Sequence, residues 1–265
     1  MQPLNRHQFK NRIAANFGQK VNRYAKNAVV QQKLLSMIVP KILSLSRPEQ
    51  KWVDFGCGNG DLENRLIRQE FPAFLTGFDI ALDSLKFCRK HGDPSISWIC
   101  ADIEHVPLKP ASFNGIIASS VLQWTRSLTE TFKMVSHLLK PEGIFIFAMF
   151  SEGSFRELTE MQKKFNLPSP VILPEKTMIL AMLKAQDFIC RDCEPFSETL
   201  YFPSAFHLLQ HLGSIGSTNM KTPPLTRSRL MKFCAEFENT YATDLGIPLT
   251  YEAIAGTARK GVCNV

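Results

Sequence analysis

Short apolar segments alternate with helical patterns through residues 51–150, and this alternation constrains the fold more than any other feature of the chain. The helical patterns span 61–70, 82–91 and 128–139. Strands joined by helices of this length form parallel β-α-β units. We therefore predict an α/β fold, a doubly wound and mostly parallel sheet with helices on both faces. Five segments have the length and composition of buried strands: Lys51–Phe55, Ala73–Asp79, Ile96–Cys100, Asn114–Ser119 and Ile144–Phe150.

The pattern changes after Phe150, where helical stretches become more frequent. We predict helices near 154–166, 174–185, 204–212 and 226–243. A strand-like stretch, Phe188–Phe202, is expected to break near Pro195, and Leu249–Thr257 is expected to return as an edge strand. Residues 151–187 and 203–246 are thus predicted to form a helical cap over the carboxyl ends of the strands, within one domain of 265 residues.

Positive charge is concentrated at the N-terminal end. Residues 1–51 contain ten Lys or Arg and one acid, whereas the remainder contains 21 basic and 23 acidic residues. A helical pattern runs from Asn22 to about Ser46, so residues 1–46 are predicted as a basic helical segment that covers the fold as a lid. Such a segment suits nucleic acid, an anionic membrane or an acidic protein, and a mitochondrial presequence is a further, less favoured interpretation.

Two of these partners find no support elsewhere in the sequence. We find no zinc-finger spacing, aromatic RNP pattern or basic recognition helix, so no nucleic-acid partner is predicted. No apolar run approaches the roughly 18 residues that span a membrane, and the start has no signal-peptide core. An acidic protein remains the favoured partner, and the expected location is the cytoplasm.

The cysteines indicate free thiols in a reducing compartment. There are seven, an odd and scattered set in a chain of this length. Cys190 and Cys193 form a single CxxC, which lacks the second pair that a structural zinc site requires. His207 and His211 lie four apart without the glutamate of a metalloprotease helix. No metal site is predicted.

Three polar elements follow successive strands. The first strand runs into the turn Asp54–Gly60, in which Gly56 and Gly58 allow close approach of a ligand to the backbone. Asp79 ends the second strand, where a carboxylate can accept both hydroxyls of a ribose, and Asp102 follows the third, where it could meet an adenine amino group. Each acid could instead cap a turn or a helix. Together, in this order and spacing, they favour an adenosine ligand.

The motifs DFGCGNG, GFDI, CADIEHVPL and KPEG resemble those of the class I S-adenosylmethionine-dependent methyltransferases. The resemblance implies a Rossmann-like, seven-stranded sheet whose last strand is antiparallel, with S-adenosylmethionine as cofactor and S-adenosylhomocysteine as product. It implies that the following residues bind the cofactor: Asp54, Gly56, Cys57, Gly58, Asp79, Ile80, Ala101, Asp102, Ile103 and Ser119.

Further elements are similar to the malonyl-acyl-carrier-protein O-methyltransferases of biotin synthesis, from about Asn11 to Arg259. They comprise Phe17-Gly18, Tyr24, Gln123-Trp124, Ile215-Gly216-Ser217, Leu225–Ser228 and Pro248–Tyr251. This resemblance implies transfer of a methyl group to the free carboxylate of a malonyl thioester. Its partner would be an acidic acyl-carrier protein, docked on the basic N-terminal segment.

Four residues are the candidates at the reacting end. Tyr24 would cover the cofactor, Gln123 and Trp124 would line the methyl-transfer pocket, and Arg227 would bind the substrate carboxylate, with Arg156 as second choice. Trp124 could equally belong to the core, and either arginine could be a surface residue. Rival interpretations are a methyltransferase for another small acid, or a cofactor-binding assembly factor or hydroxylase of related fold.

Overall fold

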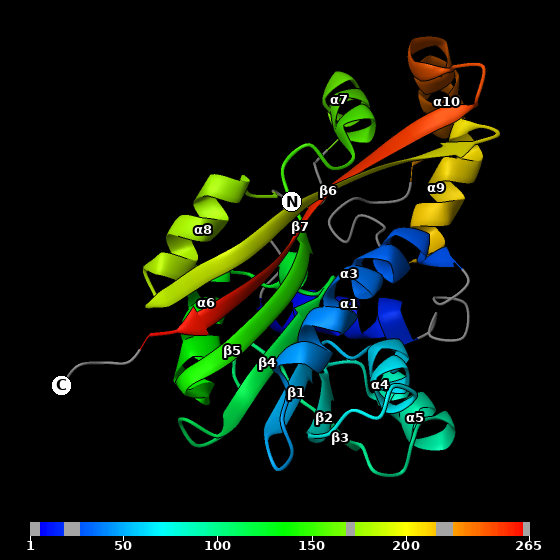
Figure 1. The fold of residues 1–265 in the computed structure, drawn as a ribbon. Coiled ribbons are helices and arrows are strands. Elements are labelled where there is room, and N and C mark those ends of the chain that lie inside the picture. The colour runs from blue at the N-terminus through cyan, green and yellow to red at the C-terminus, as the bar shows by residue number, and fades with distance from the viewer. Residues whose placement is uncertain (1–5, 19–26, 168–172, 216–224, 262–265) are drawn as a thin grey trace.

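A computed structural model describes residues 6–18, 27–167, 173–215 and 225–261 (Figure 1). Its centre is a seven-stranded sheet with the order β3-β2-β1-β4-β5-β7-β6. Strands β1 to β5 pair in parallel, whereas β7 is antiparallel to both β5 and β6. The predicted seven-stranded, mostly parallel fold is confirmed. The strands are β1 Lys51–Phe55, β2 Phe74–Asp79, β3 Ser97–Cys100, β4 Phe113–Ser119, β5 Leu139–Phe150, β6 Phe188–Phe202 and β7 Ile247–Lys260.

Two predictions about the last strands are wrong. The C-terminal strand β7 does not lie at the edge, because β6 pairs along its outer side from Phe188 to Phe202. The expected break at Pro195 does not occur either, and Pro195 pairs with Ile254 inside a continuous β6. An edge strand tolerates proline because one side of its backbone needs no hydrogen-bond donor.

Helices cover both faces of the sheet, as the strand sequences require. Along β5 the side chains of Phe145, Phe147 and Met149 enter one core cluster, whereas Ile144, Ile146 and Ala148 enter the other. A central strand buried on both faces is typical of a doubly wound sheet. The helices are α1 Arg6–Gly18, α3 Val29–Leu45, α4 Asp61–Ile67, α5 Leu82–His91, α6 Leu128–Leu138, α7 Arg156–Lys164, α8 Lys176–Lys184, α9 Ala205–Ser214 and α10 Arg227–Tyr241.

The C-terminal helices gather where β6 and β7 extend past the end of β5. The last β5 residue, Phe150, pairs with Ala253, and β7 continues from there to Ile247 paired with β6 alone. Helices α7, α9 and α10 lie around this extension (Figure 1), with Phe233 and Phe237 of α10 buried in the same core cluster as Leu249. Helix α8, predicted as part of the cap, contacts β6 and α6 on the opposite face of the sheet instead.

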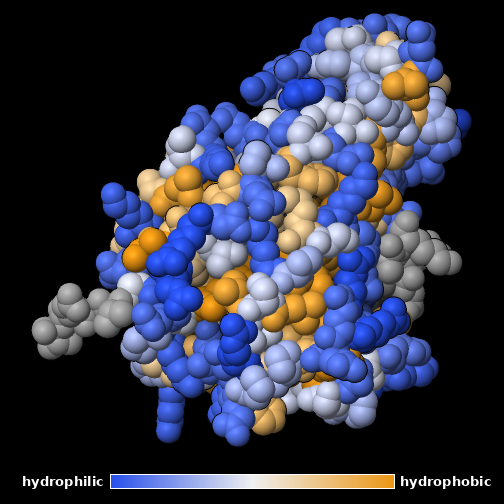
Figure 2. Space-filling model, in the orientation of Figure 1, coloured by the Kyte–Doolittle hydropathy of each residue, from blue (hydrophilic) through white to orange (hydrophobic). Residues whose placement is uncertain are grey.

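Hydrophilic and hydrophobic residues occupy different parts of the molecular surface. In Figure 2 hydrophilic residues cover most of the outline, and hydrophobic ones gather in the middle of the face shown. Within the described ranges, no helix is both long and apolar enough to cross a membrane.

Candidate functional site

A cavity of about 1060 Å³, counting the part open to solvent, lies at the carboxyl ends of β1 to β4. All ten residues that the sequence predicts for cofactor binding line it: Asp54, Gly56, Cys57, Gly58, Asp79, Ile80, Ala101, Asp102, Ile103 and Ser119. The fold therefore brings together elements that are up to 65 residues apart in the chain, because parallel strands end at the same edge.

The glycine turn forms the floor of this cavity. The Gly56 and Cys57 amides both donate to the Phe78 carbonyl, at 2.7 and 2.9 Å, which joins the turn to the end of β2. Gly56 has φ +80°, and a Cβ there would lie 2.5 Å from Val121. Only glycine fits this contact without displacing Val121. Gly58, with φ +55°, lines the cavity, and a Cβ on it would find no side chain within 4 Å.

Asp79 is fixed by the backbone on both carboxylate oxygens. Oδ2 accepts from the Gly58 amide at 2.9 Å, and Oδ1 accepts from the Ala81 amide at 2.7 Å. Burial raises the pKa of Asp79, and these amide donors oppose that rise. Each carboxylate oxygen can accept more than one hydrogen bond. Asp79 is thus a rigid acceptor at the cavity wall, as a ribose diol requires.

Asp54 forms a buried acidic pair with Glu63 of α4. Burial raises the pKa of Asp54 to about 7, and the hydrogen bond with Glu63 lowers it again in part. Burial likewise raises the pKa of Glu63, and the nearby Asp54 charge adds to this effect. Both residues are almost fully buried, at 3% and 0% exposed. Two carboxyls this close to one another favour holding at least one proton between them.

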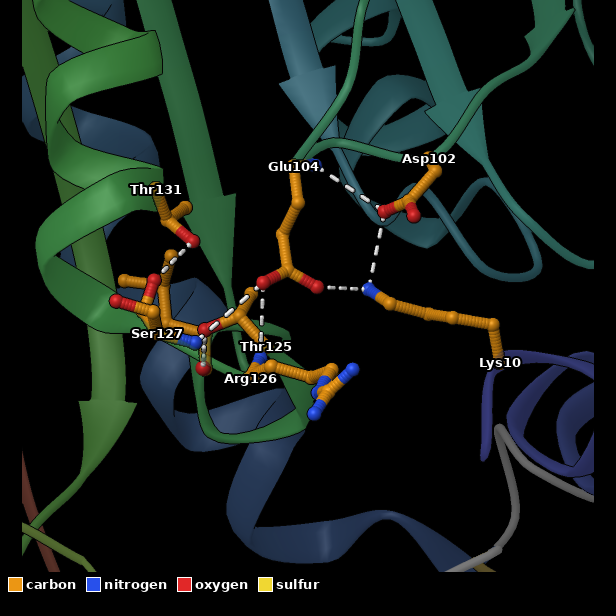
Figure 3. Close-up of polar contacts among 8 residues, drawn as sticks. Lys10, Asp102, Glu104, Thr125, Arg126, Ser127 and Thr131 are labelled. Carbon is orange, nitrogen blue, oxygen red and sulfur yellow. Dashed lines mark hydrogen bonds and ion pairs between the residues drawn. The ribbon is translucent and has the colours of Figure 1, made fainter. Parts of the chain in front are cut away.

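The third strand end is tied to the N-terminal helix by a buried cation (Figure 3). Lys10 of α1 pairs with Asp102, Nζ to Oδ1 at 3.0 Å, and also with the Glu104 carboxylate. Lys10 and Glu104 are 9% and 7% exposed. Buried charges are costly unless they are paired, so this pairing stabilises α1 against the cavity.

Glu104 links the same pair to the loop after β4. Its Oε1 accepts from the Arg126 amide at 2.9 Å and from the Ser127 amide at 3.4 Å, as Figure 3 shows. The Glu104 amide in turn donates to Asp102 Oδ1 at 3.1 Å. The sequence does not single out Lys10 or Glu104 as site residues. Lys10 is one of the ten basic residues within 1–51, and Glu104 is marked only by its place in the CADIEHVPL motif.

The two N-terminal helices close the remaining side. Ile13 and Phe17 of α1 and Gln31 and Leu35 of α3 line the cavity. The ring of Phe17 meets Trp124 edge-on, with centroids 5.5 Å apart, so Trp124 lies in the cavity wall. Such aromatic pairs position one another and exclude water.

The other residues predicted to take part in methyl transfer do not line the cavity in the described part of the chain. Gln123 is absent from the described lining, and its Nε2 donates to the Ser120 carbonyl at 2.8 Å. Arg227 is exposed at the start of α10, and the structure does not bring it to the cavity. Arg156 pairs with Glu157 at 3.4 Å and with Glu252 at 4.0 Å. Tyr24 lies outside the described residues.

The lining fits a nucleoside-containing cofactor such as S-adenosylmethionine. The Ser119 and Ser120 hydroxyls line the cavity and are buried without a hydrogen-bond partner in the described part of the chain. Buried polar groups normally find a partner, and a polar ligand would supply one. Gly58 leaves room against the backbone, and Asp79 provides the acceptor for hydroxyl donors. Among the described residues, no group of three or more His, Cys, Asp or Glu could hold a metal ion.

Comparison with known proteins agrees with this geometry. A family model described as "Methyltransferase domain" matches residues 53–147, the stretch that contains β1 to most of β5 and every predicted cofactor residue. A solved structure of Haemonchus contortus phosphoethanolamine N-methyltransferase 2, in complex with S-adenosyl-L-methionine, shares the fold. Its TM-score is 0.54 at 17% identity, over 85% of this chain and 52% of that one.

Two curated relatives have nearly equal identity to this chain. One is the malonyl-[acyl-carrier protein] O-methyltransferase of Bacteroides fragilis, 27% identical over 256 residues, which are 94% of this chain. This chain spans half the length of that relative. The other is the human mitochondrial arginine-hydroxylase NDUFAF5, 26% identical over 237 residues, which are 84% of this chain and 67% of the relative.

Proposed function

We propose that this chain, whose residues 53–147 match a methyltransferase domain, uses S-adenosylmethionine to methylate the free carboxylate of a malonyl thioester carried by an acyl-carrier protein. The O–CH₃ bond would form as the S–CH₃ bond of the cofactor breaks, leaving S-adenosylhomocysteine and a malonyl methyl ester. The observation that carries the substrate assignment is similarity to a malonyl-[acyl-carrier protein] O-methyltransferase across 94% of this chain.

The cavity supplies what binding of the cofactor requires. Asp79 would accept the ribose hydroxyls, and the Gly56–Gly58 backbone would lie against the ligand. The cofactor, when bound, supplies an electrophilic methyl group on a sulfonium. Asp54 also lines the cavity and would contribute negative charge to it when its carboxyl is ionised.

The chemistry asks little of the protein beyond alignment. A carboxylate is already deprotonated at neutral pH, so the reaction needs no general base. Phe17 and Trp124 give the cavity an apolar wall, and positioning of the two reactants against each other would contribute most of the rate. Among the described residues that line the cavity there is no histidine to pair with an aspartate, and this reaction needs no such dyad.

Two arginines are candidates for the partner of the substrate carboxylate. Arg227 follows from the sequence resemblance but is exposed at the start of α10. Arg126 is exposed directly after Thr125, which lines the cavity, and its amide is fixed by Glu104. Arg126→Ala and Arg227→Ala distinguish them, since loss of the carboxylate partner should raise the KM for malonyl thioester and leave cofactor affinity unchanged.

The carrier protein would dock on the basic N-terminal segment. Three of its cations are already paired with acids of the body: Lys10 with Asp102 and Glu104, Lys33 with Glu198, and Lys41 with Asp192 and Glu194. These three contribute less to a field that attracts an acidic partner. Docking is therefore proposed for Lys20, Arg23 and Lys26, which lie outside the described residues.

The deciding experiment measures transfer of radiolabelled methyl from the cofactor to malonyl-carrier protein and to malonyl-coenzyme A, side by side. We expect a base-labile methyl ester on the carrier-bound malonyl group. Absence of transfer, with cofactor binding intact by calorimetry, would overturn the substrate assignment and leave the fold and cofactor site standing.

An arginine side chain of a protein partner is the second candidate substrate. It is favoured by the 26% identity to the human arginine-hydroxylase, a value close to that of the malonyl relative. Hydroxylation of arginine needs dioxygen and an electron donor, so intact-mass measurement of candidate protein partners, after aerobic incubation with enzyme, cofactor and a reductant, separates the two. A mass increase on arginine, without malonyl ester formation, would support this second function.

A further inference from the structure

The pair Cys190 and Cys193 on β6 lies apart from the cofactor cavity and takes no part in the proposed reaction. Residues three apart on a regular strand point to opposite faces of the sheet. Here the register shifts between Cys190 and Asp192, so that Cys190 pairs with Ala258 and Cys193 pairs with Gly256 of β7. Ala258 and Gly256 are two apart and share a face, and therefore the two cysteines share it as well.

The bulge brings the two sulfur atoms into contact. Their separation is 3.4 Å, and both side chains are half-buried, so a small reagent in solvent can reach them. Position 256 must be small for this arrangement, because a Cβ there would lie 2.7 Å from Cys193 Sγ. The strand partner is thus shaped to accept the thiol.

The surroundings make one thiol a nucleophile and keep the other protonated. The hydrogen bond with Cys193 lowers the pKa of Cys190 to about 7, and the same hydrogen bond raises the pKa of Cys193. Lys176 of α8, whose Nζ donates to the Cys193 carbonyl at 3.0 Å, adds positive charge nearby. A thiolate beside a protonated thiol is the arrangement from which intramolecular disulfides form.

Metal binding explains this pair less well. A structural zinc ion takes four ligands, and no group of three or more suitable side chains occurs in the described ranges. Asp192 faces the other side of β6, where it pairs with Lys41 of α3.

We propose that Cys190 and Cys193 form a redox-active dithiol that exchanges with low-molecular-weight disulfides. The Cys190 thiolate attacks one sulfur of the small disulfide, forming a mixed disulfide and releasing one thiol. Cys193 then loses its proton and displaces the second thiol. The product is a Cys190–Cys193 disulfide, so that the protein dithiol is oxidised and the small disulfide is reduced to two thiols. The dithiol lies on the edge strand β6 of the sheet, on the face covered by α8, and Lys41 lies on the other face.

A second thiol pair in the same chain provides an internal control. Cys57 and Cys88 are also neighbours, beside the glycine turn, but they are only 5% and 1% exposed. Burial raises the pKa of Cys57, which makes it a poor nucleophile. Oxidation at neutral pH should therefore reach Cys190 and Cys193 well before Cys57 and Cys88.

The test equilibrates the full chain with glutathione buffers of increasing oxidised fraction, followed by alkylation and peptide mass spectrometry. We expect Cys190 and Cys193 to escape alkylation together, with loss of two hydrogens, and Cys193→Ser to accumulate a glutathione adduct on Cys190. Independent alkylation of the two cysteines at every ratio would overturn the proposal.

Two further measurements keep the result interpretable. Cys100→Ser and Cys234→Ser remove thiols that are exposed or half-buried, and the disulfide should still form in this background. Gly256→Ala, with its fold verified by circular dichroism, should displace Cys193. It should therefore change the oxidised fraction of glutathione at which half of the Cys190–Cys193 pair is a disulfide. Oxidation of Cys57 with Cys88 at the same ratio as the β6 pair would also contradict the proposal.

Discussion

At the residue scale, the function of the cavity depends on a few carboxylates whose positions are set by backbone amides. Asp79 is the clearest case, because both of its oxygens accept amide hydrogens and therefore cannot rotate away from the cavity. Asp54 and Glu63 show the opposite situation, a buried pair whose charge is held only at a cost in free energy. Both cases lead to measurements.

Asp79→Ala should weaken cofactor binding, because the ribose hydroxyls lose their acceptor and the Gly58 amide loses its partner. Hydrogen bonds to a charged group contribute about 1.5–3 kcal/mol, so the cofactor Kd should rise about tenfold to hundredfold. Isothermal calorimetry measures it. Asp93→Ala is the matched control, since Asp93 is half-buried away from the cavity lining and its carboxylate accepts from the Ser95 amide and hydroxyl. Equal affinity in both variants would refute the placement of the ribose.

Stability without cofactor should fall as pH rises from about 4 to 7. The pKa of Asp54 is raised from 3.8 to about 7, so in this window the folded state binds more protons than the unfolded state. The stabilisation is present at the acid end and is lost as Asp54 ionises, by roughly 2–4 kcal/mol. Asp54→Asn removes this titration. Urea unfolding of both proteins from pH 4 to 8 gives the free energy of unfolding as a function of pH. The curves of the two proteins should converge or cross, and parallel curves would contradict the assignment.

At the element scale, α1 and α3 matter because they carry cavity-lining side chains from outside the methyltransferase match at 53–147. Helix α1 is joined to the cavity by Lys10, and α3 is joined to β6 by Lys33 and Lys41. The element boundaries within 51–150 were predicted to within a few residues, because both faces of the central strands are apolar and the connecting helices are amphipathic. The fifth strand begins earlier than predicted, since β5 starts at Leu139 rather than Ile144 and its register with β4 shifts there.

Lys10→Met should destabilise the protein more than Lys33→Met. Removing Lys10 leaves Asp102 and the buried Glu104 without their shared cation, at an expected cost of about 1–3 kcal/mol. Lys33 forms an ion pair with Glu198 at 2.6 Å, and its side chain is 47% exposed, so its loss should cost about 0–1 kcal/mol. Equilibrium unfolding in urea compares them at one pH. Equal losses of unfolding free energy in the two variants would mean that the ion pairs of Lys10 with Asp102 and Glu104 do not hold α1 in place.

At the scale of the whole molecule, the distribution of charge decides which face can receive an acidic partner. The N-terminal segment carries the entire positive excess in the sequence, yet folding pairs several of its cations with acids of β6 and of the loop after β3. A count of charges along the chain cannot include these pairings, because the partners are 92 to 165 residues away. The docking surface is proposed for three other cations of this segment, Lys20, Arg23 and Lys26.

Reversing Lys20, Arg23 and Lys26 to Glu should lower kcat/KM for malonyl-carrier protein and flatten its dependence on salt. Turnover of malonyl-pantetheine, which lacks the acidic carrier, should be unchanged, because the field acts on association. A matched triple reversal at Lys109, Lys133 and Lys184, all exposed, serves as the control. If both triple variants behave alike, the basic segment has no specific part in docking.

The sequence by itself determined the parallel strands of the sheet, their connecting helices and the polar residues at their carboxyl ends, because strand-helix alternation and the polar residues after each strand are local patterns that parallel topology converts into one cavity. The tertiary structure alone decided which side chains reach that cavity from elsewhere. Lys10 and Phe17 line it, Arg227 does not, and Cys190 meets Cys193 only through the bulge between Cys190 and Asp192. These outcomes depend on packing and strand register between distant segments, and no local pattern of residues encodes them.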